Sequence, residues 1–287
     1  MSQMSVAVPQ STMRARQRLE KLASHLILAL FSLVIVYPVA WMVFASFKTP
    51  EELVTNIWGL PGSLVWENYV KAWQAARLGN ALFNSVFVSL MVVLLVVAFA
   101  APAAYALAKF PFRFATAIFL LFVVTMQAPV PVIPLYVMLV RMHLTDSYFG
   151  LILPMVAGGL PLAIFIFRAF FLTIPRELEE AAVVDGSTRW GAFRRVVLPI
   201  STPAIATVSI LQFLGAWNEY FLALILIRSP ERRTIPLAVQ VFFYSFGRSE
   251  WTQVFAALTI GSLPMIIVYI LMQRQFIQGL TSGAVKG

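Results

Sequence analysis

Residues 173–199 read TIPRELEEAAVVDGSTRWGAFRRVVLP and lie between two long apolar runs. The pattern predicts two short helices joined by a turn. Pro175 suits a first helical turn, and the acidic residues that follow it lie near the positive end of the helix dipole. Asp185 and Gly186 end that helix, because glycine can adopt a left-handed closing conformation, and Ser187 can cap the next one. The stretch is expected to form a compact projecting element with a face of small residues, although a connector resting amphipathically on the membrane surface fits the composition equally well.

The apolar runs outside this stretch are long enough to cross a membrane. A helix needs roughly 20 mostly apolar residues to span the hydrocarbon core. We therefore predict an all-α integral membrane protein with six transmembrane helices, in which residues 173–199 connect the fourth and fifth spans. The predicted spans are about 22–47, 80–108, 114–140, 148–171, 200–227 and 252–273, within one transmembrane domain at 22–287 that follows an N-terminal arm at 1–21 and ends in a tail at 274–287.

The composition supports this class and excludes others. The chain of 287 residues is 60% hydrophobic and 11% charged, with a mean hydropathy of +0.85, which excludes an ordinary soluble enzyme. Its net charge of +9 comes from basic residues scattered between apolar runs, which argues against nucleic acid as a partner. There is no cysteine, and neither His25 nor His143 has a motif partner, so we predict no metal site and no catalytic residues.

The basic residues also predict the orientation. Placing the N-terminus inside puts the larger share of the 21 Lys and Arg residues in the cytoplasm, including Arg14, Arg16, Arg18 and Lys21 directly before the first span. The apolar run behind this arm is longer than the core of a signal peptide, so we expect an uncleaved span. Both termini are expected to be cytoplasmic.

The long extracytoplasmic stretch at 48–80 carries several aromatic residues. Trp58, Trp66, Tyr69 and Trp73 lie among scattered charges there. Such residues commonly belong to the interfacial aromatic belt, and they can also form part of a docking surface for an extracellular partner. The loop alone does not decide between the two.

Within residues 173–199 a spaced set of residues resembles a known motif. The set is Glu180, Ala181, Ala182, Gly186, Val196, Leu198 and Pro199. Its spacing matches Glu-Ala-Ala-x3-Gly-x9-Ile-x-Leu-Pro, the EAA motif of ABC importer permeases, with Val196 as the one conservative departure. The motif also stands where that family has it, between two spans on the cytoplasmic side.

Further stretches narrow the resemblance to the carbohydrate-uptake branch, especially the maltose-type second permease subunit. They are QRQFIQGLTSGAVKG at 273–287, WNEY at 217–220, LTDS at 144–147 and LILP at 151–154. The resemblance implies a subunit of the prokaryotic cytoplasmic (inner) membrane, surrounded by lipid, that hydrolyses nothing itself and holds no cofactor. It also implies four partners: a second permease subunit of similar fold, an ATPase homodimer that binds ATP and Mg, a periplasmic or extracellular solute-binding protein, and a sugar substrate.

The resemblance assigns two contacts with the ATPase. The first is the coupling contact, for which the candidates are Glu180, Ala181, Ala182, Asp185, Gly186, Leu198 and Pro199. The second is the C-terminal tail, with Thr281, Gly283, Lys286 and Gly287, although a Gly-rich terminus is by default a solvated end.

The fifth span contains the main candidates for the substrate pathway. A carboxylate such as Glu219 costs at least ~2.5 kcal/mol inside a membrane and usually faces a cavity or a partner. Trp217 or Tyr220 could stack on a sugar ring, while Asn218 and Glu219 form hydrogen bonds. Contacts with the second permease subunit explain the polar pair equally well. Gln127, beside the prolines at 129, 131 and 134 that should kink or open the third span, is a further candidate.

Three alternatives to a sugar importer are an importer of a different solute, an intramembrane enzyme and a channel-like or structural subunit. The same machinery could import a polyol or a glycerol phosphate ester, but an anionic ester favours cationic groups at the midplane, and the predicted spans offer only Glu219 there. An intramembrane enzyme would need a nucleophile and base or a metal site, for which the sequence has no pattern. A channel-like or structural membrane subunit would leave the EAA motif without a purpose. The importer of a neutral sugar is therefore preferred.

Overall fold

The computed structural model describes residues 10–128, 130–244 and 250–284, and every regular element in them is helical. The elements in chain order are α1 (Gln10–Ser46), α2 (Pro50–Thr55), α3 (Glu67–Ala75), α4 (Leu78–Lys109), α5 (Ala115–Thr125), α6 (Val132–Arg141), α7 (Tyr148–Phe171), α8 (Arg176–Val184), α9 (Arg189–Ala192), the π-helical turn η1 (Phe193–Val197), α10 (Leu198–Ile200), α11 (Thr202–Trp217), α12 (Phe221–Leu226), the 3₁₀ turn η2 (Pro230–Arg232), α13 (Ile235–Val239), α14 (Val241–Tyr244) and α15 (Trp251–Ala284).

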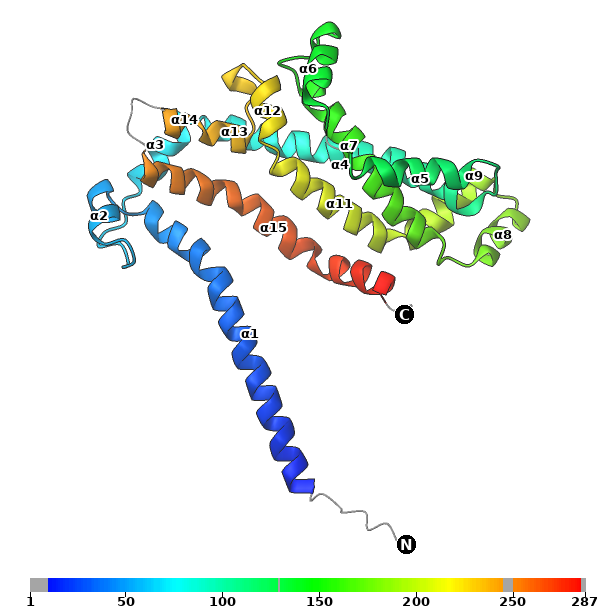
Figure 1. Cartoon of the computed structure of the whole chain (residues 1–287), viewed down its shortest axis with the longest axis horizontal. Helices are drawn as coiled ribbons and strands as arrows, with labels where there is room; N and C mark the ends of the chain where they lie inside the picture. Colours follow the sequence, from blue (N-terminus) through cyan, green and yellow to red (C-terminus); the bar gives the residue numbers. More distant parts are fainter. Residues whose placement is uncertain (1–9, 129, 245–249, 285–287) are drawn as a thin grey trace.

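The body of the molecule is an elongated bundle built on α4 (Figure 1). Helix α4 packs against α7 and α11, and α11 packs in turn against α15. The elements α8 and α9 lie at one end of the bundle, and α3, α13 and α14 lie at the other. The C-terminal end of α1 contacts α15, and the rest of α1 extends away from the body. The apolar surface of residues 22–36 is therefore exposed within this chain.

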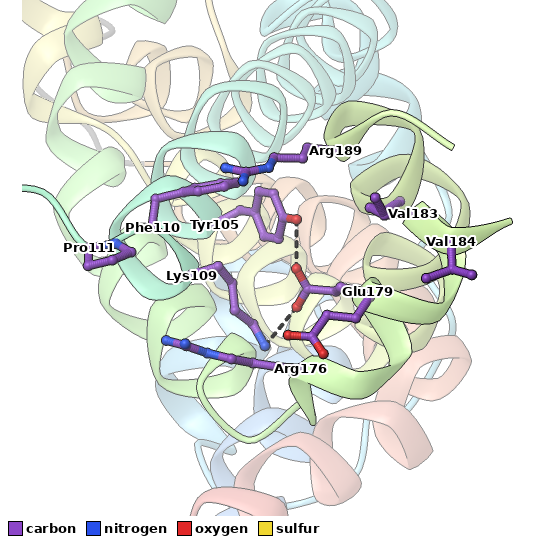
Figure 2. A pocket seen from close by; sticks show the side chains of 11 residues that line it. Tyr105, Lys109, Phe110, Pro111, Arg176, Glu179, Val183, Val184 and Arg189 are labelled. Carbon is purple, nitrogen blue, oxygen red and sulfur yellow. Dashed lines mark hydrogen bonds and ion pairs between the residues drawn. The ribbon is translucent and has the colours of Figure 1, made fainter. Parts of the chain in front are cut away.

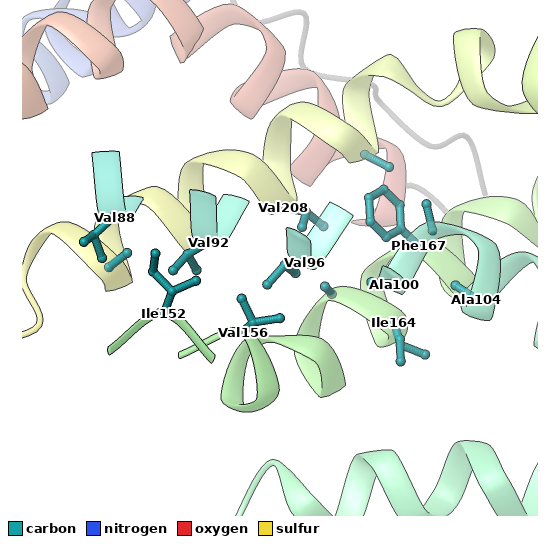
Figure 3. Close-up of a cluster of buried hydrophobic side chains, with 14 of the residues drawn as sticks. Val88, Val92, Val96, Ala100, Ala104, Ile152, Val156, Ile164, Phe167 and Val208 are labelled. Atoms are coloured by element: carbon teal, nitrogen blue, oxygen red, sulfur yellow. The ribbon is translucent and has the colours of Figure 1, made fainter. Parts of the chain in front are cut away.

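The centre of the bundle follows from a four-residue repeat along α4. The repeat is Val88, Val92, Val96, Ala100 and Ala104, all of them buried. Residues four apart lie on one face of a helix, so these small side chains form a ridge that lets neighbouring helices approach closely. Figure 3 shows the ridge facing side chains from α7 and from α11.

A glycine makes the contact between α7 and α11 close. A Cβ added at Gly159 would lie 2.2 Å from Oε1 of Gln212, and the Gln212 amide donates a hydrogen bond to the Gly159 carbonyl oxygen at 3.3 Å. The polar side chain of Gln212 within an apolar helix is therefore satisfied by packing between helices.

Four of the described helices are long and apolar enough to cross a membrane, within α1, α4, α7 and α15. A fifth is reached if 189–200 and α11, which are bent by 75°, are counted together. The predicted third span is instead two shorter apolar helices, α5 and α6. The break between α5 and α6 matches the expectation from the prolines: Pro131 is the residue directly before α6, and Pro129 lies outside the described residues.

The predicted fifth span is also interrupted. Instead of one helix over 200–227, α11 ends at Trp217 and α12 begins at Phe221. Glu219 explains the break, because its Oε1 accepts a hydrogen bond from the backbone N–H of Leu222 at 2.8 Å. An acceptor side chain at this position satisfies a free donor of the new helix and so favours a second start.

A polar network centred on Asp146 holds the end of the bundle opposite α8. Asp146 has a φ of +52°, and its carboxylate accepts hydrogen bonds from the backbone N–H groups of Arg228 and Ser229 at 3.0 and 2.9 Å and from the Ser229 hydroxyl. Burial raises the pKa of Asp146, but the bonds from Ser229 and Arg228 and the nearby Arg232 guanidinium outweigh it, so the pKa lies below its ordinary value. The ionised carboxylate thus ties the 228–232 loop to the start of α7.

Candidate functional site

Helix α8 projects from the end of the bundle (Figure 1). Seven of its nine residues are exposed, Glu179 and Ala182 are partly buried, and the helix packs mainly against α9 and η1. Val183 and Val184 are 45% and 86% exposed, and the nearby Trp190 is 59% exposed. An apolar surface of this kind outside the spans is typical of a site where another protein binds.

The turn that closes α8 has the predicted glycine conformation. Gly186 has a φ of +89°, and the N–H of Ser187 donates to the carbonyl oxygen of Ala182 at 2.9 Å. This bond satisfies a carbonyl at the helix C-terminus, as left-handed closing turns do. The left-handed turn predicted at Gly186 is confirmed.

The predicted cap of the next helix was wrong by one residue. The Oγ1 atom of Thr188, not the hydroxyl of Ser187, accepts a hydrogen bond from Gly191 N–H, at 3.1 Å. Ser187 belongs to the closing turn of α8, whereas Thr188 has the extended backbone that an N-cap needs.

The residues predicted for the coupling contact fall in two places. Those at 180–186 share the projecting element: Glu180, Ala181, Asp185 and Gly186 are exposed, and Ala182 is half-buried. Leu198 and Pro199 instead begin α10, beyond the π-helical turn, where the chain bends into α11. The residues at 180–186 thus form an exposed surface, whereas Leu198 and Pro199 lie where the chain continues from that surface into α11.

A buried ionic cluster joins α8 to the end of α4 (Figure 2). Nζ of Lys109 lies 2.7 Å from Oε1 of Glu179 and donates to the carbonyl oxygen of Ile174 at 2.7 Å. The Tyr105 hydroxyl donates to the other carboxylate oxygen of Glu179, also at 2.7 Å. The side chains of Lys109 and Glu179 are only 6% and 14% exposed, and Figure 2 shows Glu179 reaching from α8 between its two partners.

A pocket of about 410 Å³ adjoins this cluster. Its walls include Glu180 and Val183 of α8, Arg189 of α9, and Phe110 just after α4. The Arg189 guanidinium carbon lies 5.3 Å from the centroid of the Phe110 ring, a cation–π distance. The base of α8 is therefore a charged cleft as well as a structural joint.

Sequence reasoning missed this cluster. Lys109 and Glu179 are 70 positions apart, so no local periodicity relates them. A signal was nonetheless present: Lys109 directly ends a long apolar run, where a basic side chain needs a partner or the membrane surface.

The structure brings three of the pathway candidates together in a second pocket, of about 470 Å³. Trp217, Asn218 and Tyr220 line it at the break between α11 and α12, facing side chains of α13 and α15 such as Pro236 and Ser262. The Trp217 side chain is almost fully buried, whereas Tyr220 is 38% exposed. The pocket is thus an aromatic cleft next to an interrupted helix.

The other two pathway candidates are not in this lining. The Glu219 carboxylate instead accepts a hydrogen bond from the backbone N–H of Leu222. Gln127 is exposed at the break between α5 and α6. Of the tail candidates, Thr281 and Gly283 lie in the last turns of α15, and Lys286 and Gly287 lie outside the described residues. In the part of the chain that the structure describes, no three His, Cys, Asp or Glu side chains form a group that could hold a metal ion.

Residues 97–282 match the family described as binding-protein-dependent transport system inner membrane component. This range includes α8 and most of the residues that line the two pockets. The chain belongs to this family. It is therefore a multi-pass permease subunit of an ABC transporter in the inner membrane, and not itself an enzyme.

Curated relatives extend the similarity to nearly the whole chain. The probable ABC transporter permease protein YurM of Bacillus subtilis is 38% identical over 91% of this chain and 87% of its own length. The trehalose transport system permease protein SugB of Mycobacterium tuberculosis is 36% identical over 87% of this chain and 92% of its own. The arabinooligosaccharides transport system permease protein AraQ of Halalkalibacterium halodurans is 32% identical over 90% and 94%.

A solved structure supports the fold. A chain of a bacterial ABC transporter involved in the import of the acidic polysaccharide alginate superposes with a TM-score of 0.80, at 24% identity, over 91% of this chain and 98% of that one. The helical arrangement in Figure 1 is thus shared with that chain.

Proposed function

We propose that this chain forms half of the translocation pathway of an ATP-driven importer for a carbohydrate, a mono- or oligosaccharide. The observation that carries the proposal is the set of relatives named for trehalose and arabinooligosaccharide transport, which are 32–36% identical over about nine tenths of the chain. A second permease subunit of similar fold supplies the other half.

In the proposed topology the chain crosses the membrane six times with both termini in the cytoplasm. Helices α5 and α6 together make the third span, and α11 with α12 makes the fifth. Interrupted helices are common where transporters bind their substrates near the bilayer midplane, because the freed backbone groups face a cavity. The outer loops, including 48–80 with its exposed Trp58 and Trp66, then face a periplasmic or extracellular solute-binding protein.

The projecting element at α8 is the proposed contact with an ATPase homodimer, which binds ATP and Mg in its own subunits. Glu180, Ala181, Ala182, Asp185 and Gly186 supply the surface. The exposed apolar side chains of Val183 and Val184 support this role, because a partner must cover them. Residues 281–287 of the tail make a second contact with the ATPase.

The pocket beside Trp217 is the proposed substrate-facing part of this chain. Its lining in the described chain contains aromatic, apolar and small polar side chains but no Lys, Arg, Asp or Glu. Such a lining suits the ring faces and hydroxyl groups of a neutral sugar better than an anion, which would need a nearby cation. Gln127 and Glu219, outside this lining, are further proposed pathway residues.

One relative favours a second candidate. The sulfoquinovosyl glycerol transport system permease protein SmoH of Agrobacterium fabrum is 35% identical over 88% of this chain. The second candidate is therefore an anionic substrate, which would obtain its cationic contact from the second permease subunit.

The test is the ATPase rate of the complex purified on this chain, placed in liposomes with its solute-binding protein and given neutral sugars, polyols, glycerol phosphate esters and anionic glycosides in turn. Stimulation by a neutral sugar alone supports the proposal. Stimulation by an anionic ligand alone selects the second candidate, and failure of any ATPase subunit to purify with the chain refutes both.

A matched pair of variants tests the pocket. Tyr220→Ala, inside the lining, should raise the ligand concentration needed for half-maximal stimulation. Tyr269→Ala, which removes an equally large and 57% exposed ring from α15 outside the lining, should not. Equal effects of the two would argue against the pocket as part of the pathway.

A further inference from the structure

The link between α8 and the spans is concentrated in very few atoms. Apart from the partly buried Glu179 and Ala182, the residues of α8 are exposed, and the helix packs mainly on its own neighbours in the chain, α9 and η1. Glu179 is the exception, because its carboxylate enters the bundle and meets Lys109 and Tyr105 of α4. The carboxylate is therefore the direct side-chain link from α8 to α4, beside the indirect links through η1 and through the chain that joins α7 to α8.

Lys109 holds α8 at two points. Its ammonium group lies against the Glu179 carboxylate in the middle of the helix and also binds the carbonyl oxygen of Ile174, two residues before the helix begins. The ion pair and the hydrogen bond from one side chain thus restrain both the helix and the segment that leads into it. The geometry is that of a fixed joint.

The α4 side of the joint is rigid. The Tyr105 ring packs against Phe110, Phe171 and Phe193, with ring centroids 5.5, 6.1 and 4.7 Å away. These rings come from the chain just after α4, from α7 and from η1. Because packed aromatic cores deform little, a force on the Tyr105 hydroxyl moves the end of α4 rather than bending one side chain.

We propose that Glu179, held by Lys109 and Tyr105, is the positioning residue that carries displacement of α8 to α4 during transport. Helix α4 bears the ridge from Val88 to Ala104 on which α7 and α11 pack, so a movement of its end reaches the helix that leads to the Trp217 pocket. This inference rests on the proposed function, in which an ATPase contacts α8.

The decisive variant is Lys109→Ala with Glu179→Ala. Removing both partners strands no buried charge, in contrast to either single change. The measurement is substrate molecules imported per ATP hydrolysed, in liposomes, with the amount of ATPase bound per permease determined on the same samples. We expect ATPase binding to persist and transport per ATP to fall by about fivefold or more, the lower range of typical allosteric couplings.

The matched control is Arg113→Ala with Glu177→Ala. It removes the same two charges from the same two regions of the chain, but from exposed positions for which loss of a surface charge has little effect. Tyr105→Phe, which removes one of the bonds to Glu179 and retains the ring, should lower transport per ATP by less than the double change does. A merely structural role would lower the yield of complex and leave transport per ATP unchanged.

The results separate the inference from the function on which it rests. If no ATPase binds the unmodified chain, the proposed function fails. If the double Ala variant binds ATPase and transports normally per ATP, the joint is refuted while the proposed function stands.

A second test does not require the double Ala variant to fold. The chain has no cysteine, so spin labels can be placed at single cysteines introduced for Glu177 in α8 and Phe99 in α4. In the otherwise unmodified complex, the distance between the labels should be the same without nucleotide and with ATP bound. A change in that distance on ATP binding would overturn the joint.

Discussion

Replacement of Gly186 tests whether the conformation of the turn after α8 matters for ATPase binding. The residue has a φ of +89°, and a Cβ added there would meet no atom within 4 Å in this chain. The cost of a substitution is therefore conformational rather than steric. For an ordinary L-residue the left-handed region costs roughly 1–2 kcal/mol, and a β-branched residue fits it worse still.

The size of the effect follows from this cost. If the ATPase binds only the left-handed turn, Gly186→Ala should lower its apparent affinity by about 5- to 30-fold, the factor that corresponds to 1–2 kcal/mol. Gly186→Val should lower it further. Gly186→Asn should stay closer to the unmodified chain, because asparagine tolerates positive φ better than other residues.

The assay is titration of purified ATPase subunits onto the permease in detergent, with thermal stability of the permease measured beside it. The order expected from conformation is Gly, Asn, Ala, Val, from tightest to weakest, with little change in stability. Asparagine is larger than alanine, so a steric contact with the partner would instead place Asn below Ala. That reversed order, or unchanged binding by the Val variant, would refute the reasoning.

Two further predictions concern the end of the molecule opposite α8. Asp146→Asn should speed amide hydrogen exchange in 228–232 at neutral pH. In the unmodified chain the pKa of Asp146 lies below its ordinary value of 3.8, so protection of these amides should persist down to about pH 3.8 and be lost as the pH falls further. Loss of protection well above that pH would contradict the carboxylate's role. Gly150→Ala should destabilise the purified permease by about 1–3 kcal/mol, because the new Cβ would lie 1.9 Å from the backbone oxygen of Leu144. Gly158→Ala, whose Cβ meets open space, is the control in thermal unfolding, and equal losses would argue against the close approach.

Local sequence patterns predicted the features that depend on neighbouring residues. The apolar runs indicated the long helices, the prolines at 129–134 indicated a broken third span, and the Asp185-Gly186 pair indicated the left-handed turn. Each of these depends on backbone geometry within a few residues. The cap at Thr188 and the new helix start after Glu219 were missed, because several polar side chains near a helix start can serve as the acceptor.

What the sequence by itself determined is the class of protein: its hydropathy requires helices in a membrane, and the motif at 180–199 names the family. Only the tertiary structure decided which distant side chains meet. Lys109 with Glu179 and Asp146 with Ser229 are pairs 70 and 83 positions apart. The physical reason is that hydropathy reports whether a segment is more stable in the membrane or in water. A contact between distant segments depends instead on how whole helices pack, and that packing is set jointly by side-chain ridges, close approaches at glycines and helix breaks.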